Sequence, residues 1–168
     1  KKLIDDMKDI VSLIDATNLV FGQDGYKKYL VIFQNNHELR PTGGFAGSFA
    51  VVDVKNGKID WDIPEGGTYD LQGQMNLPIK PPVPMQTVNK EWEFQDSNWY
   101  SHLPASAQLM ERMYEEARGD SVDGVITINA TVLKRLLKVV GPIKNNKIDG
   151  ELNSQNVLSK LQYKVERG

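Results

Sequence analysis

The dipeptide Asn56-Gly57 constrains the fold of this chain more than any other feature. Both residue types tolerate the positive φ angles of a two-residue β-turn, and regularly alternating residues follow them. A strand is predicted before the turn, from about Ser48 to Val54. After the turn, three large apolar residues alternate with Asp60 and Asp62, which fit a solvated strand face better than a paired acid and base. The pattern predicts an antiparallel β-hairpin.

A strand–helix unit is predicted beside this hairpin. The continuous apolar run 29–33 predicts a central strand covered on both faces, and residues 122–128 predict another strand. Asn129 directly after that strand can cap a helix over residues 130–140, and the Gly-Pro pair that follows is expected to stop the helix. A short segment follows at 143–148 and is interrupted by Asn145-Asn146.

Amphipathic helices are expected to pack against the sheet. Apolar residues spaced three and four apart from Leu3 to Ile14 share one face of a helix that runs to about Ala16, and this face is expected to be covered. A second helix begins near Pro104 and ends by Gly119, and a terminal helix is expected from about residue 154. The sequence therefore predicts one α/β domain over residues 1–168, with a mixed sheet, a β-hairpin and helices packed against it.

The segment 64–90 contains five prolines and three glycines and shows no helical or strand periodicity. This composition predicts a long loop. Such a loop either borders a binding surface or is a proline-stiffened wrap on the protein surface.

Composition excludes several classes of function. Twenty basic and 22 acidic residues give a formal net charge of −2, and no basic run with interleaved aromatic residues occurs, so nucleic-acid binding is not expected. The absence of cysteine excludes disulfides, zinc–thiolate sites and a cysteine nucleophile. No stretch of about 20 apolar residues occurs. Both ends nevertheless predict a fragment of a longer chain, so any membrane contact would come from segments outside this sequence.

Three ordered blocks carry a family resemblance. The blocks are Gln34–Phe45, then Asp96-Ser97-Asn98-Trp99 with Leu103-Pro104-Ala105-Ser106-Ala107, then Val122-Asp123-Gly124-Val125-Ile126 through Gly141-Pro142-Ile143. Together they resemble the bacterial domain-of-unknown-function family number four thousand and twelve. The resemblance implies an N-terminal membrane segment in the full-length protein, which would anchor this domain outside the cytoplasmic membrane as part of the cell envelope.

The third block also resembles, more distantly, the LytR-CpsA-Psr phosphotransferases. That family moves lipid-pyrophosphate-linked glycopolymers onto the cell wall, using arginines and acidic magnesium ligands. Two positions depart from the expected patterns. Arg40 is followed by Pro41-Thr42 and lacks the acidic residue that those enzymes have two positions on, and Gln95 stands where the related family usually has arginine. A neutral amide there cannot grip phosphate as a guanidinium does.

The candidate ligand-binding residues lie in the first two blocks. They are Arg40, Thr42, Gly43, Gly44, Asn35, Asn36, Asp96 and Asn98. Arg40 follows a predicted central strand and lies beside Gly43, Gly44 and Gly47, where it could anchor an anion or simply pair with another loop. The neutral side chains could meet sugar hydroxyls or cap loop backbone, and Asp96 with Asn98 could share a divalent ion or form an Asx-turn.

Other chemistries find no support in the sequence. The two histidines, His37 and His102, lack the spacing of a zinc site, and no serine lies in a Gly-x-Ser-x-Gly elbow. No phosphate loop or dinucleotide fingerprint occurs. No metal or cofactor is expected, except Mg²⁺ if the chain were a transferase. Among Trp61, Trp92, Trp99, Tyr69 and Tyr100, at least two are expected in the core, and any exposed ring could stack on a sugar.

Three functions remain open on the sequence. The first is a non-catalytic extracytoplasmic module that binds a cell-envelope glycan, a lipid-linked precursor or an envelope protein. The second is a LytR-CpsA-Psr-like transferase or phosphohydrolase, with Arg40 gripping phosphate and Asp96 holding Mg²⁺. The third is an assembly scaffold whose end helices pair with a neighbouring copy or domain.

Overall fold

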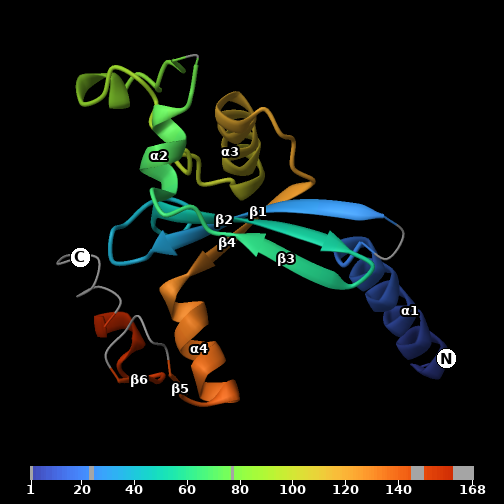
Figure 1. Ribbon diagram of the computed structural model, residues 1–168. Coiled ribbons are helices and arrows are strands. Elements are labelled where there is room, and N and C mark those ends of the chain that lie inside the picture. Colours follow the sequence, from blue (N-terminus) through green and yellow to red (C-terminus); the bar gives the residue numbers. More distant parts are fainter. Residues whose placement is uncertain (1, 23–24, 77, 145–149, 161–168) are drawn as a thin grey trace.

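The computed structural model describes residues 2–22, 25–76, 78–144 and 150–160, and its centre is a four-stranded mixed sheet (Figure 1). The strand order is β3-β2-β1-β4. Its members are β1 (Tyr26–Asn35), β2 (Phe45–Lys55), β3 (Lys58–Asp62) and β4 (Gly124–Asn129). β1 pairs antiparallel with β2 and parallel with β4, so it is a central strand. The predicted single α/β domain with a mixed sheet is confirmed.

The predicted hairpin is the β2–β3 turn. Asn56 and Gly57 have φ angles of 50° and 72°, as a turn that follows the strand twist requires. Lys55 and Lys58 are the last paired residues before it, in antiparallel register. All five residues of β3 are exposed, which agrees with the solvated face expected for its two aspartates.

The main core lies on one face of this sheet, beneath α2 (Gly67–Gly73) and α3 (Leu103–Arg118) (Figure 1). Leu30 and Ile32 of β1 and Phe49 of β2 are fully buried there against α3 residues such as Met110. Each such side chain contributes about 1.5–3 kcal/mol of burial free energy. Trp92 and Trp99 also pack in or against this core, as expected for two of the aromatic residues.

The predicted boundaries of the two helices on either side of β4 are confirmed. Asn129 caps α4 (Ala130–Val140), since its Oδ1 accepts the backbone N–H of Val132 at 3.2 Å. Gly141 ends the same helix with φ = 85°. Pro104 lies in the first turn of α3, and Gly119 closes that helix in the left-handed region, with φ = 76°.

The prediction of one continuous loop over residues 64–90 is wrong, because that segment contains α2 and a 3₁₀ turn, η1 (Met85–Thr87). Tertiary contacts hold α2 in place: the Thr68 hydroxyl donates to the Ala46 carbonyl at 2.8 Å, and Leu71 is fully buried. A seven-residue helix with a glycine at each end is too short to show a period in the sequence.

The first helix departs from expectation in length and in packing. α1 spans Lys2–Val20, beyond the predicted end at Ala16, and its apolar face is not covered within the described chain. Ile4, Met7 and Val11 are each more than half exposed. The helix projects from the sheet (Figure 1), and among the described residues its attachment is at the last turn, where the Tyr29 hydroxyl donates to the Val20 carbonyl at 3.0 Å.

A small second layer lies under α4. Strand β5 (Ile143–Lys144) pairs antiparallel with β6 (Glu151–Leu152), which the sequence did not predict. Leu137 of α4, Leu152 and Val157 form a compact second core. Part of the segment predicted at 143–148 lies outside the described residues. The expected terminal helix is described only as a helical turn at 157–160, and the rest of it lies outside the described residues.

Candidate functional site

The candidate residues gather at one edge of the sheet. β1 and β4 are parallel, with Gln34 opposite Asn129, so the carboxyl ends of both strands meet there. Open α/β sheets commonly bind ligands outside such strand ends. The loop 36–44 leaves β1 at this edge and returns as β2, just after a register shift between Phe33 and Gln34.

Two glycines give the loop its shape. Gly43 and Gly44 have φ angles of 127° and 149°, a region that residues with a side chain rarely adopt. A Cβ atom on Gly44 would lie 2.3 Å from the carbonyl oxygen of Asn35, and one on Gly43 would lie 2.8 Å from Oε1 of Gln34. The Gln34 side-chain amide also donates to the Thr42 hydroxyl at 3.4 Å. The glycines therefore allow the loop to fold back tightly on the end of β1.

Arg40 and Asp96 form an ion pair at the outer side of this loop. The distance from Nε of Arg40 to Oδ1 of Asp96 is 3.0 Å, and the side chains are 30% and 17% exposed. Nη1 of Arg40 donates to the Leu39 carbonyl at 3.1 Å, and the guanidinium lies 5.4 Å from the centre of the Phe45 ring. The acidic partner that the sequence lacks two positions after Arg40 is thus supplied by the second block.

Asn98 holds the loop from below. Its side chain is fully buried, and Nδ2 donates to the Gly44 carbonyl at 2.6 Å. Gln95 and Ser97 beside it are also buried. Asp96 is the C-terminal residue of the 3₁₀ turn η2 (Phe94–Asp96) and is the only residue of this stretch, 95–98, that is not buried. Asn98 therefore positions loop backbone, while Asp96 reaches the surface.

Four buried polar atoms near the loop have no hydrogen-bond partner among the described residues. They are Oδ1 of Asn36, Oε1 of Gln95, Oγ of Ser97 and Oδ1 of Asn98. Buried polar atoms are nearly always paired, and an unpaired one costs about 1–3 kcal/mol.

Asn35 and Asn36 serve local structure. Oδ1 of Asn35 accepts the backbone N–H of His37 at 3.1 Å, which is an Asx-turn, and its Nδ2 donates to Glu38 at 3.0 Å. Nδ2 of Asn36 donates to the Thr131 hydroxyl in the first turn of α4 at 3.2 Å. Both side chains remain half-buried, so each retains a surface toward solvent.

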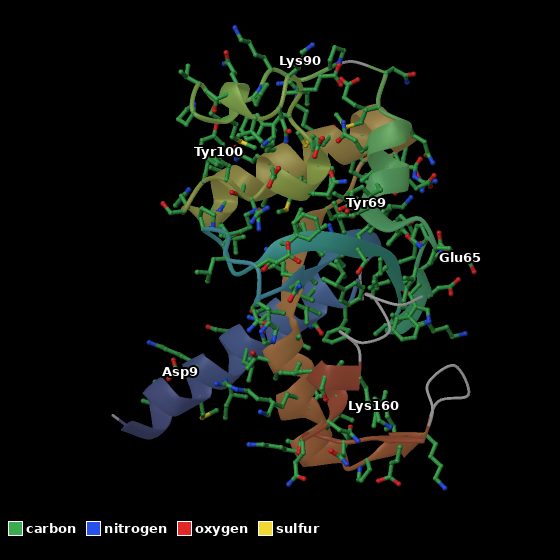
Figure 2. All side chains as sticks on the ribbon, turned by 90° about the vertical axis from the view of Figure 1, so that its left-hand side faces the viewer. Asp9, Glu65, Tyr69, Lys90, Tyr100 and Lys160 are labelled. Carbon is green, nitrogen blue, oxygen red and sulfur yellow. The ribbon has the colours of Figure 1, made fainter. Side chains whose placement is uncertain are left out.

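Tyr69 extends the site beyond the predicted residues. It lies on α2, is 64% exposed, and its ring centre is 6.5 Å from that of Phe45. Figure 2 shows Tyr69 directly above the strands, on the side of α2 and α3. The sequence offered Tyr69 as one of several possible stacking rings, but nothing could place it because α2 was not predicted. The docking of α2 through Thr68 brings the ring into contact with Phe45, the residue beneath Arg40.

The described residues contain no group of three or more histidine, cysteine, aspartate or glutamate side chains that could hold a metal ion. Across the same parts of the chain, no helix has both the length and the apolar character needed to cross a membrane. The arrangement at the loop is thus an aromatic pair, one internally neutralised ion pair and a set of amides and hydroxyls. Such groups can donate hydrogen bonds to a polar ligand and accept hydrogen bonds from it.

Comparison with known proteins identifies the family of this chain. The model of the family described as "Protein of unknown function (DUF4012)" matches residues 24–165. No curated protein and no solved structure matches the chain. The match extends from just before β1 to beyond the second small core and includes all three sequence blocks. On this match, the chain belongs to the DUF4012 family.

Proposed function

We propose that this chain is a non-catalytic extracytoplasmic module of a membrane-anchored bacterial cell-envelope protein, and that it binds a glycan. The binding surface would be formed by Arg40, Phe45, Tyr69 and Asp96. One observation carries the proposal: the guanidinium of Arg40 is already neutralised by Asp96 and lies over the Phe45 ring. The envelope location rests on the family resemblance described for the sequence.

A phosphate site needs a cation that is not already paired, and the described residues of this surface do not supply one. The Arg40 charge is balanced by Asp96 at 3.0 Å. Arg118 is paired with Asp70 at 3.6 Å, on the side of α3 that meets α2. A neutral surface with an exposed tyrosine ring and partly exposed amides suits sugar hydroxyls and the apolar face of a sugar ring.

The alternative is a LytR-CpsA-Psr-like transferase or phosphohydrolase acting on lipid-pyrophosphate-linked glycopolymers. The observation in its favour is that the structure brings together one basic and one acidic side chain from two separate blocks. A pyrophosphate would have to displace Asp96 from Arg40. The released carboxylate would then be available to Mg²⁺, which prefers oxygen ligands.

Calorimetric titration separates the two functions. The probes are N-acetylglucosamine oligomers and a soluble polyprenyl-pyrophosphate analogue, each with and without Mg²⁺. If the chain binds a glycan, the oligomers should bind it equally well with and without Mg²⁺. Tyr69→Ala should then reduce their affinity at least about tenfold. The control is Trp61→Ala, which removes another exposed ring, on β3, and should leave binding unchanged.

Two results would contradict the glycan proposal. If only the pyrophosphate analogue binds, with Mg²⁺ dependence and loss in Arg40→Ala, the transferase becomes the better description. If the oligomers bind but Tyr69→Ala and Trp61→Ala behave alike, the surface assigned to the glycan is wrong. Arg40→Ala is expected to weaken oligomer binding less than Tyr69→Ala, because Arg40 is already engaged by Asp96.

A further inference from the structure

Two helices present apolar stripes that the rest of the described chain leaves exposed. On α1 the stripe consists of Ile4, Met7, Val11 and Ile14, whose spacing of three, four and three keeps them on one face, and each is more than half exposed. On α4 the stripe consists of Val132, Leu136, Val139 and Val140, between 39% and 85% exposed. Scattered exposed apolar residues are ordinary, whereas a continuous stripe indicates an interaction surface.

The two helices carry opposite charge. The sequence of α1 has four aspartates and two lysines, a net charge of −2. The sequence of α4 has three basic residues, Lys134, Arg135 and Lys138, and no acidic residue, a net charge of +3. Complementary charges of this kind orient and select partners. An acidic helix is also unsuited to the anionic surface of a bacterial membrane, which attracts basic amphipathic helices.

The two stripes cannot meet within one copy as the chain is folded. α1 is fixed at the amino end of β1, where the backbone N–H groups of Asn56 and Gly57 donate to the carbonyls of Gly22 and Phe21 at 3.1 and 3.3 Å. α4 begins at the carboxyl end of the parallel strand β4. The ten residues of β1 separate these ends by about 33 Å. Both helices nevertheless lie on the sheet side opposite α2 and α3 (Figures 1 and 2).

We propose that the apolar stripe of α1 docks on the apolar stripe of α4 in a second copy of this chain. Two copies exchange their α1 helices in this way and form a symmetric dimer with two identical contacts. Such reciprocal pairing is the commonest form of protein self-association. Because α1 is already helical and is joined to the sheet at its last turn, docking costs less conformational entropy than folding a disordered segment would.

Analytical ultracentrifugation of the whole chain over a wide concentration range tests the proposal. The wild type is expected to dimerise, with a Kd that rises with added salt because opposite charges face each other. Val11→Asp and Leu136→Asp should each raise that Kd at least about tenfold. The matched control on α1 is Leu13→Asp, since Leu13 is 67% exposed but lies off the stripe. These side chains are exposed, so the variants should fold, and circular dichroism verifies this.

Mixing the two variants identifies the contact. In a mixed dimer of Val11→Asp and Leu136→Asp, one contact carries both changes and the other carries neither, so mixing should restore association. A wild type that stays monomeric at all concentrations would overturn the proposal. Dimers that are weakened by Val11→Asp but not by Leu136→Asp would also overturn it, because α1 would then pair with another α1. Equal effects of Val11→Asp and Leu13→Asp would show that the stripe is not the contact.

Discussion

The guanidinium of Arg40 and the carboxylate of Asp96 are 56 residues apart in the sequence and 3.0 Å apart in the fold. This ion pair connects the loop after β1 to the turn η2, and so joins the first two family blocks. A second link runs in parallel from the Asn98 side chain to the Gly44 carbonyl. One partly exposed ion pair and one buried hydrogen bond therefore join the loop of the candidate site to the second block.

Removing one member of the ion pair should destabilise the fold modestly. We expect Asp96→Asn to lower the free energy of unfolding by about 1 kcal/mol, since the pair is partly shielded from solvent but not fully buried. Urea denaturation of Asp96→Asn, Arg40→Met and the double variant gives a double-mutant cycle. A coupling energy near zero would show that the two side chains do not interact in solution.

The conformation of Gly44 makes a stronger prediction. Gly44→Ala combines a φ of 149° with a Cβ placed 2.3 Å from backbone oxygen, and neither can relax without moving the loop. We expect a loss of at least about 3 kcal/mol in unfolding free energy, or no folding. Gly57→Ala is the matched control: its φ is 72° but a Cβ there has open space, so the loss should be about 1 kcal/mol. Similar losses for the two variants would contradict the loop geometry.

Local signals in the sequence were sufficient to predict much of the fold. The positive φ angles of Asn56 and Gly57, the cap at Asn129 and the helix end at Gly119 all follow from residue chemistry over a few positions. α2 was missed because its position depends on a hydrogen bond from Thr68 to a carbonyl 22 residues away. A local sequence pattern cannot predict a contact between residues so far apart.

The candidate site was predictable in its location but not in its partners. Strand ends and glycines pointed to the loop around Arg40. The pairing with Asp96 depends on how η2 packs against β2, and the contribution of Tyr69 depends on α2. The exposure of α1 could not be foreseen either, because an amphipathic pattern predicts an apolar face without saying which surface covers it.

Acid should weaken the sheet at the end opposite the site. The Lys27 ammonium, and then the backbone N–H of Lys28, bond to Asp123 at 2.8 Å each and lower the pKa of its carboxyl. Lys28 likewise lowers the pKa of Asp120. A carboxyl whose pKa is lower in the folded than in the unfolded state stabilises the fold at pH values above its unfolded-state pKa. This stabilisation is lost as the pH falls below about 4.

Thermal unfolding at a series of pH values tests this assignment. Asp123→Asn should be less stable than the wild type near neutral pH, and its melting temperature should fall less between pH 5 and pH 3, roughly the range over which carboxyls titrate. The control is Asp60→Asn, because Asp60 lies on exposed β3 and forms no ion pair with the described residues. Parallel acid profiles for the wild type and Asp123→Asn would refute the role of Asp123.

The unpaired hydroxyl of Ser97 predicts that this core position tolerates substitution by alanine. Ser97 is fully buried and its Oγ has no hydrogen-bond partner in the part of the chain that the structure describes, so the folded state bears a desolvation cost that alanine removes. We expect Ser97→Ala to leave the unfolding free energy unchanged or to raise it by up to about 1 kcal/mol. Ser106 is equally buried, but its hydroxyl donates to the Tyr100 carbonyl at 3.0 Å. Ser106→Ala should therefore cost about 1 kcal/mol. Chemical denaturation of the two variants measures the difference, and a loss in Ser97→Ala as large as that in Ser106→Ala would mean that the Ser97 hydroxyl is paired in solution.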